Sequence, residues 1–360
     1  MTVGMLLGPQ RPTPIVGEAV AMLEVDRVRG DGRIAAITAG WQEREAEDQE
    51  MSAALGNHTV NLMLHARGEA VFREDQDFFA AHRAKQDRLR QLEDLYRLRL
   101  ASALKGARRV QQATAPRDLI EPELEEALQA LRLLDAQHVL KVKQIEEDFD
   151  RQHRPQERPA LRRHLDQIDA ILKDCSALAI AGGHVAVLYN RLRLFDLRSR
   201  IVRRPELPVI AWSAGAMVVS DRIVLFHDSP PQGRGNAEVL GPGLGLFSGV
   251  VVLPHASRRL MLRNHDRLTV FARRFAPAVC VALDQRCWLR FNGPRWTMGP
   301  TTYQLATDGH LVNNHGDRPT PSPTPSSATT SATTSATTSA TTSATTSATT
   351  SATTSATPSA

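Results

Sequence analysis

Short, almost uninterrupted apolar runs between residues 175 and 312 most constrain how this chain can fold. A strand with one face in water alternates apolar and polar residues, whereas several of these runs do not alternate. They therefore predict strands of a sheet that is covered on both faces, with helical segments between them, as in an α/β fold. The runs are SALAIAGG, LPVIAW, GVVVLP, RLTVFA and AVCVAL.

Residues 1–66 repeat this pattern on a smaller scale. VGMLLGPQ and RIAAITAGW read as short buried strands that end at Gly or Pro, and PIVGEAVAMLEV between them has helical spacing. Strand, helix and strand in this order predict a βαβ unit with a parallel pair. Together, the two flanks of the chain predict one doubly wound α/β domain.

Residues 69–174 differ, because their apolar residues follow the period of long amphipathic helices. One helix is predicted around DRLRQLEDLYRLRLASAL, and a second carries an apolar stripe from Leu124 to Phe149. TAPRDLIEPELEE between them supplies a break and acidic residues near the next helix start. We expect an antiparallel hairpin inserted in the α/β domain. Such stripes favour packing on a core over a partner-binding surface.

The end of the chain does not read as a folded domain. Residues 319–360 contain no charged residue, and residues 327–354 are seven copies of SATT. Such a tract has too little apolar bulk to offset the entropy of ordering it, so we expect a disordered tail. Residues 1–318 then form one domain, with the helical insertion at 69–174.

Charge and cysteine usage bear on partners and compartment. The net charge is +5, and basic and acidic residues are interleaved, without the basic stripe of a nucleic-acid surface. The three cysteines form no CxxC pair, which fits buried, reduced thiols. No apolar stretch reaches the ~18 residues of a membrane span, and the first residues lack the features of a secretory signal. We expect a cytoplasmic protein that binds neither nucleic acid nor membrane.

Ser213 lies where a predicted strand meets a predicted helix. The strand LPVIAW precedes it and AGAMVV can begin a helix, within the pattern Ala211-Trp212-Ser213-Ala214-Gly215. A nucleophilic serine is displayed on such a sharp turn, where small neighbours avoid clashes and a helix N-terminus favours developing negative charge. The alternative is a small-residue turn that contains a serine.

Two further segments can complete such a site. His255 follows the strand GVVVLP, so it is expected at the same sheet edge as Ser213, where it can act as the base that a serine requires. Gly182 and Gly183 follow another strand, and the Gly183 and Ala214 N–H groups can form an oxyanion hole. The alternatives are a hydrogen-bonded loop histidine and a glycine-rich turn.

These elements, in this order, resemble the class I glutamine amidotransferase-like superfamily, and more narrowly its serine peptidase branch, which contains dipeptidase E and cyanophycinase. The resemblance rests on Gly182-Gly183, Ser213-Ala214-Gly215-Ala216 and Pro254-His255, and it covers roughly residues 1–66 and 175–300. It implies a flavodoxin-like doubly wound sheet and hydrolysis of a peptide or isopeptide bond, with no metal or organic cofactor. Ser213 would attack and His255 would be the general base and then the acid.

The acid of the predicted triad stays open. The cyanophycinase-like pattern has an acidic pair after the histidine strand, but here the pair is Asp284-Gln285. In a regular strand Asp284 would point to the opposite face. In dipeptidase E the acid comes soon after the serine, which would be Asp228 here. Arg258 and Arg259 can hold a substrate carboxylate, although solvation at the surface is the simpler interpretation.

Other functions remain as alternatives. A non-catalytic binding or scaffolding module is favoured by Gln285 and by the long helices. An α/β-hydrolase would fit the order Ser213, Asp228, His255, but its oxyanion segment is missing. GPGLGLFSG leads into a strand rather than a helix, which argues against a nucleotide site, and no histidine pair predicts a metal site. The expected ligand is a small peptide-like substrate, and a homodimer is an open alternative to a monomer.

Overall fold

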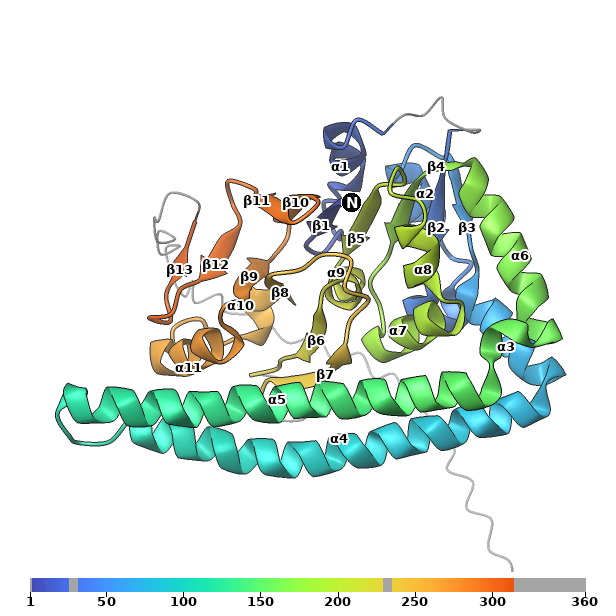
Figure 1. Ribbon diagram of the computed structural model, residues 1–360. Coiled ribbons are helices and arrows are strands. Elements are labelled where there is room, and N and C mark those ends of the chain that lie inside the picture. Colours follow the sequence, from blue (N-terminus) through green and yellow to red (C-terminus); the bar gives the residue numbers. More distant parts are fainter. Residues whose placement is uncertain (1, 26–31, 229–234, 314–360) are drawn as a thin grey trace, which may run out of the picture. The chain divides into compact units, whose positions relative to one another are not determined.

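The computed structural model describes residues 2–25, 32–228 and 235–313. The tail predicted to be disordered lies outside the described residues. The described chain is a mixed α/β structure with a mostly parallel central sheet and a long helical hairpin (Figure 1). The predicted fold class is therefore confirmed, and the arrangement is consistent with a flavodoxin-like fold.

Seven strands form the central sheet. Five of them, β1, β5, β4, β2 and β3, are parallel to one another. Beyond β1 the sheet is extended by β10 and β11, which pair in antiparallel fashion. In spatial order the strands are β11 (Arg295–Met298), β10 (Trp288–Asn292), β1 (Val3–Leu7), β5 (Val209–Trp212), β4 (Cys175–Ile180), β2 (Arg33–Ile37) and β3 (Thr59–Asn61).

The predicted pairing of the first two strands is wrong. β1 and β2 flank helix α1 (Val16–Met22) as expected, but β5 and β4 lie between them in the sheet. Each strand pairs in parallel with a strand from the second flank of the chain. Local sequence predicts the elements of a βαβ unit, but it does not determine which strands become neighbours, because distant strands can enter between them.

A second sheet contains the strand that precedes His255. Its four strands are β13 (Leu311–Val312), β12 (Tyr303–Leu305), β9 (Val279–Leu283) and β8 (Val250–Pro254), and β8 and β9 are parallel. A separate pair consists of β6 (Arg222–Leu225) and β7 (Glu238–Pro242). The expectation that Ser213 and His255 share one sheet edge is therefore wrong, since their strands belong to different sheets.

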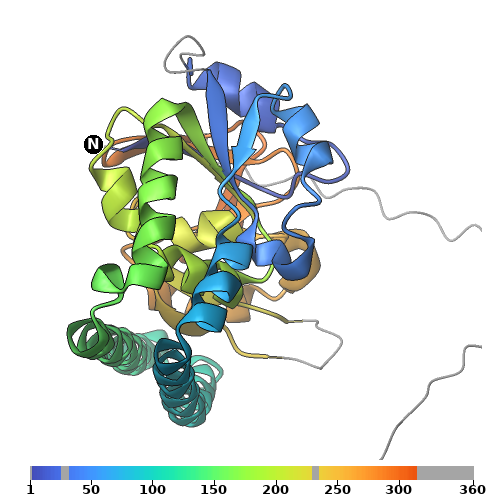
Figure 2. The same ribbon diagram turned by 90° about the vertical axis from the view of Figure 1, so that its right-hand side faces the viewer.

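The central sheet is buried on both faces, as its apolar runs predict. Alternate residues of its strands point into two separate cores: Leu6 and Ile37 into one, Met5 and Ala36 into the other. Helices cover both faces in the end-on view (Figure 2). Besides α1, the shorter helices are η1 (Ala39–Arg44), α2 (Gln49–Ala54), α3 (Leu64–Glu74), η2 (Pro155–Glu157), α6 (Pro159–Asp174), α7 (Val185–Leu194), α8 (Leu197–Val202), α9 (Ala214–Val219), α10 (Ala256–Arg259) and α11 (His265–Phe275).

The segment RLTVFA is a helix and not the predicted strand. It lies in α11, where the Asn264 side chain accepts a hydrogen bond from the Arg267 N–H at 3.1 Å and caps the helix. Leu268, Phe271 and Phe275 are buried at helical spacing. The β-branched pair inside the segment suggested a strand, but the period of the buried residues over the longer window is that of a helix.

The predicted antiparallel hairpin is confirmed by helices α4 (Gln76–Gln111) and α5 (Arg117–His153). It lies along one side of the α/β part, with α5 packed on β7 and α11 (Figures 1 and 2). The other described helices are shorter. No described helix, α4 and α5 included, is both long and apolar enough to traverse a bilayer. The three cysteines, Cys175, Cys280 and Cys287, are buried and free.

A buried polar network attaches the hairpin to the α/β part. Asp135 of α5 accepts hydrogen bonds from Tyr96 Oη of α4 at 2.8 Å and from Arg274 Nε of α11 at 2.8 Å. Arg274 Nη1 donates to Ala237 O at 2.7 Å, and Val239 N donates to Tyr96 Oη at 3.1 Å. The side chains of Asp135 and Arg274 form an ion pair and are almost fully buried, so the charge of each is balanced by the other.

We expect Asp135→Ala to destabilise the protein by about 3–5 kcal/mol, because it leaves the buried guanidinium of Arg274 without its counter-charge. Urea unfolding measures this free energy. The matched control is Asp148→Ala, which removes an exposed carboxylate that pairs with Arg151 on the same helix and should cost less than about 1 kcal/mol. Equal losses in the two variants would show that the network does not anchor the hairpin.

Candidate active site

Ser213 occupies a strained corner between β5 and α9. Its backbone has φ 51° and ψ −121°, a conformation that costs a non-glycine residue of the order of 1–3 kcal/mol. The corner is held because Ser213 N donates to Leu7 O at 3.1 Å and Met217 N donates to Ser213 O at 3.2 Å. Among the described residues the Ser213 hydroxyl has no hydrogen-bond partner, and its side chain is only partly buried. The predicted strand-to-helix turn is thus present.

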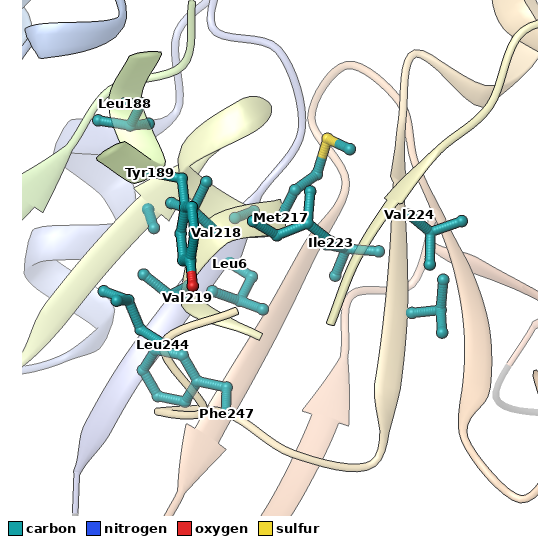
Figure 3. Packing of buried hydrophobic residues seen from close by; sticks show 14 of the residues in the cluster. Leu6, Leu188, Tyr189, Met217, Val218, Val219, Ile223, Val224, Leu244 and Phe247 are labelled. Carbon is teal, nitrogen blue, oxygen red and sulfur yellow. The ribbon is translucent and has the colours of Figure 1, made fainter. Parts of the chain in front are cut away.

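Helix α9 holds the corner in place through its own burial. All six of its residues are buried, although it is short. Figure 3 shows Met217, Val218 and Val219 packed among side chains from several elements, including Leu6 of β1 and Leu188 of α7. No side chain caps its N-terminus, so the N–H groups of its first turn, including that of Ala214, remain free for an anion within the described structure.

The glycine pair approaches a second turn that sequence reasoning missed. Gly183 has φ +119°, and a Cβ there would overlap the carbonyl oxygen of Gly40 in η1. His184 N donates to that same oxygen at 2.7 Å, and a Cβ on Gly40 would lie 2.7 Å from Gly182 O. Two backbones therefore lock together at the predicted oxyanion loop. The available signal was Gly40, which follows the strand RIAAI after two further residues.

His255 begins helix α10 in the left-handed conformation, with φ 59° and ψ 35°. Its backbone N donates to Leu283 O at 3.2 Å, which ties it to the end of β9. Burial lowers the pKa of the half-buried imidazole, as do the positive charges of Arg259 and Arg258, while the Asp284 carboxylate acts in the opposite direction. Within the described residues neither ring nitrogen has a hydrogen-bond partner.

The two candidate acids lie in different surroundings. Strand β9 ends at Leu283, so Asp284 follows the strand and its predicted opposite-face position does not apply. Its carboxylate accepts bonds from Ser257 N at 3.2 Å and Ser257 Oγ at 3.0 Å, and it raises the pKa of His255. Asp228 is buried and accepts from Arg267 Nε at 2.8 Å and Met261 N at 3.1 Å.

The hydrogen-bond partners of Asp284 and Asp228 distinguish the two candidate acids. Both oxygens of Asp228 are committed to an ion pair and a backbone N–H, which is the pattern of a structural buried charge. Asp284 raises the pKa of the His255 imidazole through its charge, without a described hydrogen bond to the ring. The neighbouring Gln285 is exposed and donates to Thr13 Oγ1 at 2.6 Å.

One cavity of about 810 Å³ brings most of the predicted site residues together. Neither candidate acid is among the residues that line it. Those predicted from the sequence that do line it are Gly183, Ser213, Ala214, His255, Arg258 and Arg259.

The segment Leu7–Gly8 connects the two sides of this cavity. Leu7 O accepts the bond from Ser213 N, while Gly8 N donates to Cys287 O at 2.9 Å in the loop after β9. A Cβ on Gly8 would overlap Asp284 O, so the two backbones approach as closely as glycine allows. The serine of the central sheet and the histidine of the second sheet are positioned against each other through this contact.

The charges around the cavity are uneven. Arg11 pairs with Glu50 and Arg44 with Glu47, whereas Arg258 and Arg259 have no ion pair among the described residues. Burial lowers the pKa of Arg259, whose guanidinium lies 6.0 Å from the centre of the Phe226 ring. Uncompensated positive charge therefore collects at the His255 side. Sequence reasoning also missed Trp41, His184 and His227, which line the cavity.

The described residues contain no group of three or more His, Cys, Asp or Glu side chains that could hold a metal ion. Three kinds of group described above could take part in chemistry at this site. It displays a hydroxyl on a strained turn, an imidazole whose lowered pKa favours its neutral form, and backbone N–H groups suited to a developing oxyanion.

Comparisons with known proteins relate part of this chain to a peptidase family. Residues 135–298 match the sequence model of peptidase family S51, a span that includes Gly183, Ser213 and His255. No curated protein matches the chain. A crystal structure of a peptidase from an acI-B1 Actinobacterium is similar at 13% identity and a TM-score of 0.29, over 60% of this chain and 85% of that one, which is too distant to carry an argument. The family match confirms the resemblance of this chain to the serine peptidase branch of the class I glutamine amidotransferase-like superfamily.

Proposed function

We propose that this protein is a serine peptidase that cleaves a peptide or isopeptide bond with Ser213 as nucleophile. The observation that carries the proposal is that the strained Ser213 and the imidazole of His255 line one cavity together with Gly183 and Ala214. The match to a peptidase family supports hydrolysis of this kind.

In the proposed mechanism His255 takes the proton of the Ser213 hydroxyl while its oxygen attacks the substrate carbonyl carbon. The negative charge that develops on the carbonyl oxygen is held by the Gly183 and Ala214 N–H groups. His255 then donates the proton to the leaving amine, and a water molecule completes hydrolysis by the same two steps. The free N-terminal turn of α9 contributes further stabilisation of the oxyanion.

Asp284 is the better candidate for the third member than Asp228. Its charge raises the pKa of His255 and would stabilise the imidazolium that forms during attack. Ser257 donates two hydrogen bonds to it and so restrains its orientation. Asp228 is instead paired with Arg267, and it is not among the charges that shift the pKa of His255.

Arg258 and Arg259 are the proposed contacts for a substrate carboxylate. Both arginines line the cavity on the side of His255, and neither forms an ion pair in the described structure. Arg259 is partly desolvated, so a substrate carboxylate beside it would gain a charge-assisted hydrogen bond. The cavity is of the size that holds a small peptide-like molecule.

A non-catalytic binding module is the second candidate. It is favoured by one observation: within the described structure the His255 ring is not hydrogen-bonded to an acid, so nothing holds its tautomer. A module of this kind would keep the cavity and bind peptide-like ligands without reacting. The first test below separates the two.

We expect Ser213→Ala to abolish labelling by a fluorophosphonate probe, because the probe reacts only with an activated serine. Thermal unfolding should change little, since the hydroxyl has no described hydrogen-bond partner. Alanine also carries a Cβ, so it bears the same backbone strain at this corner as serine. Ser102→Ala, on the exposed face of α4, is the control and should label like the wild type. Absence of labelling in folded wild-type protein would favour the binding module.

The rate of labelling should rise with pH and reach half of its maximum below pH 6.5, because the pKa of His255 is lowered and only the neutral ring accepts a proton. Arg259→Gln removes a positive neighbour and should move this midpoint upward. Asp284→Asn removes a negative one and should move it downward. A midpoint that is the same in all three proteins would show that His255 is not the base.

We expect Gly40→Ala to slow labelling by about 100-fold, because the new Cβ displaces the oxyanion loop and small misplacements at a reacting centre are this costly. The control is Gly106→Ala in α4, where nothing lies within 4 Å of a new Cβ. The control should keep the labelling rate of the wild type and gain about 0.5–1 kcal/mol of stability. Equal labelling rates in the two variants would argue against an oxyanion loop at residues 182–183.

A further inference from the structure

The helical hairpin exposes large apolar side chains that the α/β part does not cover. Leu95 and Leu98 of α4 are 62% and 70% exposed, and Leu133 and Leu140 of α5 are 57% and 64% exposed. Five of the six large hydrophobic residues exposed in the described structure lie on the hairpin, the fifth being Leu119 of α5. An apolar cluster of this kind on an otherwise polar surface is typical of an interaction site.

The contacts between the helices place these leucines at one level of the hairpin. Tyr96 stacks on His138 with ring centres 4.1 Å apart, so residues around 96 and 138 lie side by side. Helical residues rise about 1.5 Å each, so all four leucines lie within about 8 Å of this level along the axis. Leu133 and Leu140 are seven residues apart and share a face opposite the buried Val142.

This face is turned away from the rest of the described structure. In two perpendicular views no other described helix or strand lies on the outer side of α4 and α5 (Figures 1 and 2). The inner side is occupied by β7 and α11, which contact Tyr96, Asp135 and their neighbours. The hairpin is therefore covered on one side only.

Two strips of opposite charge continue this face toward the tip of the hairpin. Lys105 and Arg109 are exposed on α4, and Glu123 and Glu126 are exposed on α5. None of the four forms an ion pair among the described residues.

Other acidic residues of the same part of α5 behave differently. Glu121 and Glu125 both pair with Arg273 of α11, so they serve the inner side of the hairpin. Spacing then places Glu123 and Glu126 on the outer side, with the positive strip of α4 beside them.

We propose that the outer face of the hairpin is a homodimer interface, in which a second copy of this chain packs its own hairpin face to face about a twofold axis parallel to the helices. In this arrangement α4 of one subunit lies over α5 of the other, and the two run antiparallel. Lys105 then faces Glu126 of the partner subunit, and Arg109 faces Glu123 of the partner subunit. The leucines of both copies meet between the charged strips.

Charge selects this orientation over the reverse one. A twofold axis perpendicular to the helices, running across the hairpin, would place α4 on α4 of the second copy with the tip of one hairpin against the base of the other. Each charged strip would then face no strip of opposite charge. With the axis parallel to the helices, each positive strip faces a negative strip. This contact occurs twice, because an isologous interface repeats each contact. Complementary potentials of this kind suppress wrong pairings.

The face is large enough for a stable dimer. The 36 residues of α4 extend about 54 Å, and two adjacent helices are about 20 Å wide, which gives about 1,000 Å² per subunit. Stable interfaces bury about 800 Å² per partner. The leucines supply an apolar centre and the charges a polar rim, which is the usual anatomy of such an interface.

Light scattering of the full chain after size-exclusion chromatography tests the proposal. We expect about twice the 39.6 kDa of one chain for the wild type. Leu95→Glu combined with Leu133→Glu should give a monomer that keeps its thermal unfolding midpoint, since both side chains are exposed in one subunit. Val202→Glu, which alters an exposed apolar residue on α8, should remain dimeric. A monomeric wild type at micromolar concentration, or a dimeric leucine variant, would overturn the proposal.

A charge swap tests the orientation. Lys105→Glu alone and Glu126→Lys alone should each weaken the dimer by about tenfold or more in Kd, because each places like charges against each other twice. The double variant should restore the wild-type Kd at low salt. Failure of the double variant to recover dimerisation would exclude the parallel axis. Fluorophosphonate labelling is expected to be unaffected in all of these variants, so the result does not depend on the proposed peptidase activity.

Discussion

The burial of the central sheet on both faces is the constraint on which the remaining structure depends. Because alternate side chains of β1, β2, β4 and β5 enter two separate cores, the sheet cannot slip in register without moving apolar groups out of both. This rigidity lets the chain hold a strained backbone at Ser213, where the β1 carbonyl of Leu7 receives the Ser213 N–H. A looser sheet would relax that corner, and the hydroxyl would lose its display.

The candidate site is assembled from two sheets through backbone contacts. Gly8 approaches the loop after β9 as closely as a residue without a side chain can, and His255 N bonds to Leu283 O at the end of the same strand. Gly40 and Gly183 interlock in the same way on the other side. The Ser213 hydroxyl and the His255 ring have no hydrogen-bond partner in the described structure, so their positions follow from the backbone. This is the expected design where reacting groups must stay free for substrate.

A buried ion pair is one of several contacts that attach the hairpin to the α/β part, and the described structure covers the hairpin on only one side. Asp135, Arg274 and Tyr96 connect three elements, and neither charge would be tolerated there alone. The opposite face carries exposed leucines and unpaired charges, which a second copy would cover. An insertion that served only to cap the α/β part would not require an apolar outer face. The hairpin thus links the stability of one subunit to its proposed association.

The sequence alone predicted the α/β class, the helical hairpin and the strand-to-helix corner at Ser213, because each rests on local spacing and short apolar runs. The grouping of Gly183, Ser213 and His255 came instead from the order of their segments and from a family resemblance, and the structure places all three along one cavity. It misread RLTVFA, since two β-branched residues outweighed a helical period that only a longer window reveals. Only the tertiary structure decided that β1 and β2 are not neighbours, that His255 comes from a second sheet, and that Gly40 packs against the turn at Gly182 and Gly183. It also distinguished Asp284 from Asp228 by their partners. These features depend on contacts between residues far apart in the chain, and the free energy of such contacts leaves no pattern in any single segment.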